Sequence, residues 1–338
     1  MLSAKSRWRM VALLGSLVLL AFAAILIFHY GIRAFIGPAS RPLTDRHFQS
    51  TPQRVARGKY LVEGTAHCFG CHSPIDVNSK TGEAPPAVAG SGDSFQPFPG
   101  ATWTIPNLTP DAETGIGNWT DDQLARAIRE GISHDGHALL LMMPYRHLRH
   151  MSDEDIASVV VFLRSLPPVR HPMPPRKIPW KSQARYNRYP CPLLAPVPEP
   201  DFSDKLARGA YYIELGKCAD CHTPLDDDNQ PLPGMDFAGG NYLEEVSKAT
   251  PNLTADPSGI SYYDEKLFIR VMRTGKVGAR LLDPIMPWWY IGHMSDEDLS
   301  AMFAYLRSLK PVHHRVDNEL PSTYCRLCRQ KHGAGNQN

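Results

Sequence analysis

The hydrophobic and polar positions of this chain follow a helical period in most of the segments where a pattern is present. Residues 10–28 read MVALLGSLVLLAFAAILIF, a run of 19 positions without a charge. A helix rises about 1.5 Å per residue, so this run is long enough to cross the hydrocarbon core of a bilayer. Later segments repeat apolar residues every three to four positions and predict amphipathic helices. These helices are expected at Gln53–Thr65, Trp119–Gly131, Lys205–Leu215 and Tyr263–Gly275.

Two more helices have a defined start and end. The sequence SDED at 152–155 and again at 295–298 predicts S-x-x-D capping boxes, each flanked by apolar residues that suit a hydrophobic staple. Prolines at 167, 168 and 311 then end the two helices. No convincing strand pattern appears, so the fold class is predicted to be all-α.

Three segments occur twice in the same order, which predicts two homologous domains. The pairs are ARGKYLVEGTAHCFGCHSPID at 56–76 with ARGAYYIELGKCADCHTPLD at 207–226, TIPNLTPDAETGIGNWTDDQLARAIREG at 104–131 with ATPNLTADPSGISYYDEKLFIRVMRTG at 249–275, and MMPYRHLRHMSDEDIASVVVFLRSLPPV at 142–169 with IMPWWYIGHMSDEDLSAMFAYLRSLKPV at 285–312. The predicted division is a cytoplasmic basic segment 1–9, a transmembrane anchor 10–36, a first domain 52–170, a proline-rich basic linker 171–200, a second domain 201–313 and a C-terminal tail 314–338.

The linker has a composition unlike that of the two domains. Residues 172–200 contain nine prolines, which favour extended backbone and exclude helix. Its first part carries basic residues with no acid between them, and a solvated spacer is the simpler interpretation. The alternative is contact with anionic headgroups or with an acidic partner. The basic residues are Arg170, Arg176, Lys177, Lys181, Arg185 and Arg188.

The charges around the apolar run predict its orientation. Lys5, Arg7 and Arg9 precede it and a large domain follows it, which places the domains outside the cytoplasm. The alternative is a signal peptide cleaved at Ala21-Phe22-Ala23, but the apolar run continues to Phe28 and favours an uncleaved anchor. The expected arrangement is therefore a single N-terminal membrane anchor with both domains outside the cytoplasm. A formal net charge of +2 and the lack of an extended basic tract predict no nucleic-acid partner.

The chemistry is carried by CFGCH at 68–72 and CADCH at 218–222. Both have the C-x-x-C-H pattern of covalent c-type haem attachment. Two thiols three positions apart can reach the two vinyl groups of one haem, and the adjacent histidine directs its imidazole to the iron. Chance or a zinc site explains a single copy, but two copies at matching repeat positions disfavour both. We expect two covalently bound haem c groups, held through Cys68, Cys71, Cys218 and Cys221 with His72 and His222 as proximal iron ligands.

The sixth iron position needs another ligand, and each repeat offers candidates. Met143 and Met286 each precede a proline in corresponding loops. Position 285 is isoleucine, so Met142 has no equivalent. Neither His147 nor His171 is assigned a counterpart. Two other pairs occupy corresponding positions and stay open as sixth ligands: His150 with His293, and Met151 with Met294. The two methionines suit the hydrophobic staple, and the two histidines suit a surface position.

At these residues the chain resembles the c-type cytochrome subunits of bacterial membrane-bound alcohol and sugar-acid dehydrogenases. The resemblance covers most of residues 52–312 and rests on the C-x-x-C-H sites, the PNLTPDAETGIGNW loop, the Met-Pro loop and the MSDEDIASVVVFLRSLPP helix. It implies two tandem class I cytochrome c domains with Met143 and Met286 as distal ligands. It also implies that the haem edges are lined by Pro106, Asn107, Leu108, Pro251, Asn252 and Leu253. Such subunits commonly carry three haems and this chain has two; it also begins with an apparent anchor, so its partner enzyme stays open.

His/Met ligation fills both axial positions and favours ferrous iron, which indicates electron transfer and no catalytic site. The function expected is a membrane-anchored dihaem cytochrome that relays single electrons from a periplasmic dehydrogenase or respiratory complex to quinone, an oxidase or another redox partner protein. One alternative is a dihaem enzyme of the peroxidase or thiosulfate-oxidoreductase type. Another is a fixed subunit of a larger membrane complex. The aromatic run WWY at 288–290 is expected either to border a haem edge where partners dock or to pack against the haem.

The tail contains a third C-x-x-C pair, Cys325 and Cys328, followed by Arg329. Arginine stays protonated and cannot ligate iron, and too few residues follow to build a third haem domain. A zinc site is disfavoured because only Cys191 and His332 are seen to complete it. A disulfide from Cys191 to Cys325 or Cys328 is preferred, since domain termini often lie close together. A Cys325–Cys328 bond is the alternative.

Overall fold

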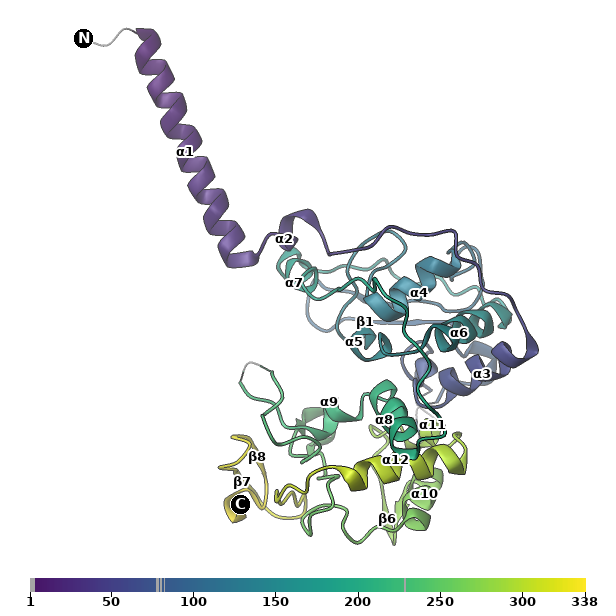
Figure 1. The fold of residues 1–338 in the computed structure, drawn as a ribbon. Helices are drawn as coiled ribbons and strands as arrows, with labels where there is room; N and C mark the ends of the chain where they lie inside the picture. Colours follow the sequence, from purple (N-terminus) through teal and green to yellow (C-terminus); the bar gives the residue numbers. More distant parts are fainter. Residues whose placement is uncertain (1–3, 77–78, 80, 82, 228) are drawn as a thin grey trace.

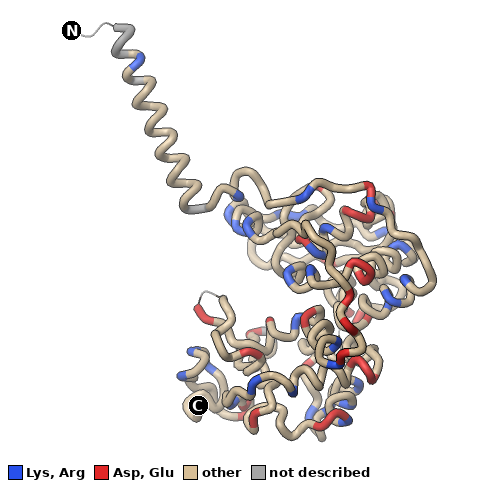
Figure 2. Tube along the Cα trace, in the orientation of Figure 1, with Lys and Arg blue, Asp and Glu red and all other residues tan. Residues whose placement is uncertain are grey.

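The computed structural model describes residues 4–76, 79, 81, 83–227 and 229–338. Helix α1 (Ala4–Tyr30) projects away from the globular part of the chain (Figure 1). Its segment Trp8–Phe28 is the one described helix that is long and apolar enough to cross a membrane. Lys and Arg occur only near its start, as Figure 2 shows. Residues 1–3 of the predicted basic segment lie outside the described residues.

The same order of helices occurs twice after α1 and the short helix α2 (Arg33–Ile36). We call residues 52–170 the first repeat and residues 201–313 the second repeat. The first contains α3 (Pro52–Glu63), η1 (Cys68–Gly70), η2 (Pro86–Val88), α4 (Asp121–Glu130), α5 (Tyr145–Leu148) and α6 (Asp153–Ser165). The second contains α8 (Lys205–Leu215), α9 (Cys218–His222), η3 (Glu244–Val246), α10 (Glu265–Thr274), α11 (Trp288–Ile291) and α12 (Asp296–Ser308). The four predicted amphipathic helices are all present, with ends within two residues of the predicted ones.

The prediction that the chain lacks strands is wrong at four places. Short antiparallel pairs join β1 (Asp93–Phe95) to β2 (Trp103–Ile105), β3 (Tyr242–Leu243) to β4 (Lys248–Ala249), β5 (Lys276–Val277) to β6 (Arg280–Leu281), and β7 (Ser322–Tyr324) to β8 (Lys331–Gly333). Each strand has two or three residues, too few for a period-two pattern to be read from sequence. The main framework is helical, and the strands only shape its loops.

Each repeat is centred on two helices whose backbones touch. A Cβ atom added at Gly58 of α3 would lie 2.0 Å from the Ser158 carbonyl oxygen of α6. Gly209 of α8 has the same relation to the Ala301 carbonyl oxygen of α12, also at 2.0 Å. Only glycine allows this approach, because any side chain would separate the helices. Around these crossings lies an apolar core that includes Leu61, Val62, Ile156, Val159, Ile213, Leu215, Leu299 and Met302.

The linker is not the helix-free spacer predicted from its prolines. Residues 180–189 contain no proline, and helix α7 (Trp180–Tyr186) forms there. The Trp180 ring lies 6.0 Å from the ring of Phe35 in α2, and the Asn187 side chain donates to the Arg33 carbonyl oxygen. Just before α7, the backbone of Lys177 pairs with that of Thr102. The linker therefore packs on the first repeat and on the segment that follows α1.

The predicted caps form, but tyrosines from the opposite repeat complete them. The Ser152 hydroxyl accepts from the Asp155 amide at 3.1 Å, as a capping box requires. The other half of that box would join the Asp155 carboxylate to the Ser152 amide. Instead, the Ser152 amide donates to the hydroxyl of Tyr211 in α8 at 3.0 Å, and this hydroxyl donates to Asp155 at 2.7 Å.

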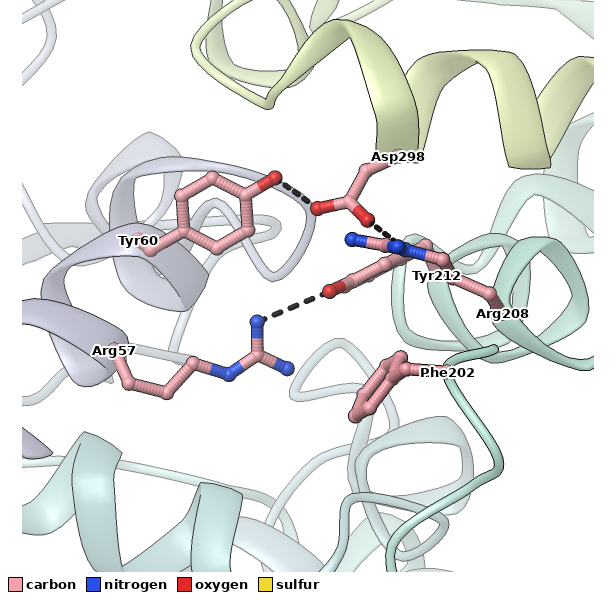
Figure 3. Close-up of a pocket in the computed structure, with 6 residues that line it drawn as sticks. All are labelled: Arg57, Tyr60, Phe202, Arg208, Tyr212 and Asp298. Carbon is pink, nitrogen blue, oxygen red and sulfur yellow. Dashed lines mark hydrogen bonds and ion pairs between the residues drawn. The ribbon is translucent and has the colours of Figure 1, made fainter. Parts of the chain in front are cut away.

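The reciprocal contact occurs at the other cap, so the repeats meet with approximate two-fold symmetry. Tyr60 occupies in α3 the place that Tyr211 occupies in α8. Its hydroxyl donates to Asp298 and accepts from the Ser295 amide at 2.9 Å. Figure 3 shows Tyr60 and Asp298 at a shallow cavity of about 480 Å³ between the repeats. The cavity is lined by Arg57, Tyr60, Phe202, Arg208, Tyr212 and Asp298.

Candidate haem-binding sites

Each C-x-x-C-H sequence holds its histidine in a defined orientation. His72 and His222 are buried, and their Nδ1 atoms lie 2.8 Å from the Pro106 carbonyl oxygen and 2.9 Å from the Pro251 carbonyl oxygen. A carbonyl can only accept, so Nδ1 carries the proton and Nε2 keeps its lone pair for a metal. Burial lowers the pKa of both imidazoles. Both side chains are therefore neutral and suited to bind iron.

The cysteines lie on a single helical turn that begins abruptly. Cys68 opens the 3₁₀ turn η1 and Cys218 opens the short helix α9. The residue before each, His67 or Lys217, has a left-handed backbone with φ of 32° or 49°. Burial raises the pKa of the Cys68 and Cys218 thiols to about 12.

The first repeat contains a cavity of about 750 Å³ into which the predicted attachment residues project. Cys68, Cys71, His72 and Met143 all line it. So do the three residues that the resemblance places at the haem edge, Pro106, Asn107 and Leu108. The rest of the wall is largely apolar, as a porphyrin requires, and includes Ile116, Leu124, Ala127, Ile128, Leu139, Leu148, Val159 and Leu163. The donor set, the wall and the volume fit a haem c group.

The Pro-Asn-Leu loops are held by their asparagines. Asn107 accepts from the Thr109 amide at 2.8 Å and donates to the Val169 carbonyl oxygen at 2.7 Å. In the second repeat, Asn252 accepts from the Thr254 amide at 2.8 Å and donates to the Val312 carbonyl oxygen at 2.9 Å. Each asparagine therefore ties the loop to the segment that leaves the terminal helix. Leu253 packs against the core of the second repeat, as Leu108 does in the first.

The two Met-Pro loops have matching backbones. Met143 lies two residues before Tyr145, where α5 begins, and its amide donates to the Leu140 carbonyl oxygen at 3.0 Å. Met286 lies two residues before Trp288, where α11 begins, and its amide donates to the Asp283 carbonyl oxygen at 3.0 Å. Both methionines are partly buried and pack against the apolar core. Met142, which also lines the first cavity, is 40% exposed.

The other candidate axial ligands lie in different surroundings. His150 and His293 are exposed, and His150 is not among the residues that line the first cavity. Met151 and Met294 are buried in the apolar core, as expected of staple residues, although Met151 also reaches the cavity wall. The geometry favours the Met-Pro loops as the source of the sixth ligand.

The sequence of this chain is similar to those of known proteins. Residues 53–163 match the family described as cytochrome c oxidase, cbb3-type, subunit III. The fructose dehydrogenase cytochrome subunit of Gluconobacter japonicus is 31% identical over 75% of this chain and 52% of its own length. The gluconate 2-dehydrogenase cytochrome c subunit of Pantoea cypripedii is 29% identical over 77% and 60%. A dihaem c-type cytochrome of Cereibacter sphaeroides is 28% identical over 72% and 82%.

This chain is homologous to dehydrogenase cytochrome c subunits. Its residues 53–163 contain a cytochrome c domain, and the predicted resemblance is confirmed. The matches span only 52% and 60% of the length of the fructose and gluconate dehydrogenase subunits. The similarity therefore identifies a cytochrome c domain, and it does not identify the partner enzyme.

Sequence reasoning missed several residues around the cytochrome c domain. The linker residues Met173 and Arg176 line the first cavity, although the linker was expected to be solvated. Lys217 of the second repeat lines it as well. The charge and the periodicity of the sequence do not reveal these contacts, because each depends on how separate segments fold back onto the domain.

One histidine was wrongly treated as having no counterpart. Aligning Val169 with Val312 pairs His171 with His314. Their amides donate to Thr114 and Ser258 at 3.0 Å each, and their Nδ1 atoms lie 3.0 Å from the carbonyl oxygens of Ser91 and Ala238 respectively. The equivalence is visible in the sequence one residue beyond the repeat as first delimited.

The aromatic run after Met286 lies partly between the repeats. Tyr290 is 4% exposed, and its ring stacks with His67 at 6.1 Å between centroids. The Tyr290 ring also lies 3.2 Å from the position that a Cβ atom at Gly70, within the first C-x-x-C-H sequence, would occupy. Tyr290 is therefore not available to an external docking partner.

The predicted disulfide clasp is absent from the described residues. Cys191 is an exposed free thiol, whereas Cys325 and Cys328 are buried free thiols. The two tail cysteines lie beside His332, which the sequence analysis considered as a possible zinc ligand, and beside His314, which it did not consider. The objection that only Cys191 and His332 could complete a metal site is therefore wrong.

Proposed function

We propose that this chain is a membrane-anchored dihaem c-type cytochrome with two tandem cytochrome c domains. It relays single electrons between a periplasmic dehydrogenase or respiratory complex and a downstream acceptor such as quinone, an oxidase or another cytochrome. The residues that would hold the two groups are Cys68, Cys71, His72 and Met143 in the first repeat, and Cys218, Cys221, His222 and Met286 in the second. Bound haem supplies reversible one-electron chemistry at its iron.

The observation that carries this proposal is that the two attachment sites adjoin across the repeat interface. Lys217, next to Cys218, lines the cavity that Cys68 and His72 share. His147 of the first repeat reaches Asp220, inside the second C-x-x-C-H sequence, at 2.8 Å. In the opposite direction, Tyr290 of the second repeat lies on Gly70 of the first motif. Neighbouring redox sites suit a relay, because electrons can pass within the chain.

The ligand set favours electron transfer over substrate chemistry. If His72 and Met143 serve as the two axial ligands, neither position is open to a small molecule, and the same holds for His222 and Met286. A thioether ligand also favours the ferrous state relative to a second imidazole. The names of the relatives, as cytochrome subunits of fructose and gluconate dehydrogenases, support a dehydrogenase as the electron donor.

The surroundings of α1 support a membrane anchor. At the end of this helix, α2 and α7 present exposed Phe35, Ile36 and Trp180. Arg188 lies within 4 Å of the position a Cβ at Gly31 would occupy, between α1 and α2. Aromatic and basic residues of this kind suit the water–lipid interface. The proposed location is a bacterial inner membrane with the two repeats on the periplasmic side.

The test is a count of haem and of open iron positions on the full chain purified in detergent. A pyridine haemochrome assay should give two haem c groups per chain, and the reduced protein should bind no carbon monoxide. Met143→Ala and Met286→Ala should each create one carbon monoxide site, whereas Met142→Ala should create none. One haem per chain, or stoichiometric carbon monoxide binding by the unmodified protein, would refute the relay and favour the enzyme alternative.

Partner identity is tested separately by co-purification from native membranes. A dehydrogenase subunit should accompany the chain, and its substrate should reduce both haems. If the chain purifies as a monomer with no associated subunit and a soluble donor reduces it, both the dehydrogenase assignment and the fixed-subunit alternative are contradicted.

A further inference from the structure

Four ligand-type side chains converge in the C-terminal tail, and none of them is among the residues proposed to hold the two haems. His314 lies after helix α12, while the other three come from the β7–β8 hairpin that closes the chain. Their ligand atoms all lie within 4.8 Å of one another. All four residues are at most 1% exposed. The cluster consists of His314, Cys325, Cys328 and His332.

The hydrogen bonds of the two histidines leave two nitrogen lone pairs facing each other within this cluster. His314 Nδ1 donates to the Ala238 carbonyl oxygen at 3.0 Å, and His332 Nδ1 donates to the Gly333 carbonyl oxygen at 2.8 Å. In neutral imidazoles with this tautomer, both Nε2 atoms carry lone pairs. These two atoms face each other at 3.0 Å. Two buried lone pairs at that distance repel unless a cation lies between them or beside them.

We propose that His314, Cys325, Cys328 and His332 bind one structural Zn²⁺ ion. Two thiolates and two imidazoles are a typical zinc ligand set, and four protein ligands leave no open coordination position. Tetrahedral zinc with bonds of about 2.0–2.1 Å to nitrogen and about 2.3 Å to sulfur separates its ligand atoms by about 3.3–3.8 Å. The His314 and His332 Nε2 atoms are 3.0 Å apart, and Cys325 Sγ is 3.4 Å from His314 Nε2. Both distances are close to that range. Because the four ligand atoms all lie within 4.8 Å of one another, they suit a single ion.

The backbone of the hairpin presents both sulfurs to one point. The Arg329 amide donates to the Cys325 carbonyl oxygen at 3.0 Å, and the Cys325 amide donates to the Gln330 carbonyl oxygen at 2.9 Å. Arg329 has a left-handed backbone with φ of 60°, which closes this turn. The Asn338 side-chain amide lies 3.5 Å from Cys325 Sγ, where it can donate to a thiolate. Outer hydrogen bonds of this kind orient metal ligands.

The ion would attach the tail to the second haem site. Ala238, which accepts from His314, precedes Gly239, whose amide donates to the His222 carbonyl oxygen at 2.7 Å. On the other side of the hairpin, Gln330 donates to the Leu225 carbonyl oxygen at 2.9 Å, three residues after His222. The zinc would therefore fix both segments that surround the second C-x-x-C-H sequence, and its role is structural.

A Cys325–Cys328 disulfide would account for the cysteines but not for the histidines. It would consume both thiolates and leave the two Nε2 lone pairs opposed at 3.0 Å in a buried position. Metal binding satisfies all four groups at once. The two alternatives predict different metal contents and different thiol counts.

The experiment measures zinc on the full chain, purified in detergent with both haems in place. Elemental analysis should find one zinc per chain, counted against protein rather than haem, and zinc-edge X-ray absorption should show two sulfur and two nitrogen ligands. Cys328→Ser and His332→Ala should each remove the zinc. They should also expose the tail to trypsin at Arg326 and Arg329. Three variants provide matched controls: Cys191→Ser, His313→Ala at the exposed neighbour of His314, and His171→Ala at the equivalent position in the first repeat. All three should keep one zinc.

The unmodified protein decides the question even if the cluster variants fail to fold. Absence of zinc together with Cys325 and Cys328 resistant to alkylation before reduction would establish the disulfide and overturn the proposal. Absence of zinc with two free thiols, or zinc bound without sulfur ligands, would overturn it equally. Because zinc is counted independently of haem iron, a failed haem count and a failed zinc count are distinguishable.

Discussion

The two repeats place a histidine at the same backbone position and use it differently. His171 and His314 both donate from Nδ1 to a carbonyl oxygen of the loop beneath them, at 3.0 Å. In the first repeat, His171 helps to line the large cavity. In the second repeat Nε2 faces His332 and Cys325. The scaffold therefore fixes the imidazole, and the chain that follows decides what the free nitrogen contacts.

The two following segments cover their repeats by different physical means. After His171, a proline-rich stretch lies along the cavity and contributes Met173 and Arg176 to its wall. After His314, the chain forms the β7–β8 hairpin and returns two buried cysteines. The linker continues into a second folded unit and is held at both ends. The tail has a small hairpin and little apolar surface, so a bound ion would supply the stability that packing does not.

The repeats are most alike at their helix crossings, and there the largest effect is expected. Gly58→Ala and Gly209→Ala each place a methyl group 2.0 Å from a carbonyl oxygen of the crossing helix. The helices would have to separate, which we expect to lower the free energy of unfolding by about 2 kcal/mol or more after the gain in helix propensity. Urea unfolding followed by haem circular dichroism measures this loss.

A matched control lies on the same helix as Gly58. Lys59→Ala changes an exposed side chain of α3 and should shift the midpoint little. Equal losses for the two glycine variants would support structurally equivalent repeats. A loss confined to one variant would show that only one crossing supports the fold.

The tyrosines that cross between the repeats provide a smaller test. Tyr211 is buried and Tyr60 is half-buried. Tyr211→Phe leaves the buried Ser152 amide without the hydroxyl to which it donates. We expect this change to lower stability by about 1–2 kcal/mol and Tyr60→Phe to cost less, because water can replace a half-buried hydroxyl. The same urea experiment measures both. A larger cost for Tyr60→Phe would contradict the burial argument.

Much of this architecture could be predicted because it depends on residues that are close together in the sequence. The helix around Lys205–Leu215 has its predicted ends, and both serine caps form. The C-x-x-C-H sequences likewise predict their ligands, because covalent haem attachment requires a fixed spacing. The capping boxes were predicted only in part, since the second half of each depends on Tyr60 or Tyr211 from the other repeat.

What could not be predicted depends on contacts between distant segments. His314 precedes Cys325 by 11 positions, a spacing that matches no standard zinc pattern. Its role becomes visible only when the β7–β8 hairpin folds back. Helix α7 was missed for the opposite reason, because the proline count of the whole linker obscured a proline-free stretch. The short strands carry too few residues to show a period.

The smallest expected effect concerns His147. The equivalent position in the second repeat is Tyr290, so this histidine breaks the symmetry of the interface. Its Nδ1 lies 3.0 Å from Glu214, and its Nε2 lies 2.8 Å from Asp220. Hydrogen bonds to Asp220 and then Glu214 raise the pKa of His147 to about 9. His150, 3.8 Å from Glu214, is the other histidine near this pair.

A pKa raised in the folded state means that the protonated form stabilises the contact. The contribution is fully present below the unfolded pKa of about 6.5 and is lost as the pH rises through about 9. Both carboxylates are partly exposed, so we expect only about 1 kcal/mol. His147→Gln should lower the unfolding free energy near pH 6 and leave it unchanged near pH 10, whereas His150→Gln should keep the wild-type pH dependence. A uniform loss at both pH values would assign His147 a packing role, and the asymmetry between the repeats would then have no electrostatic part.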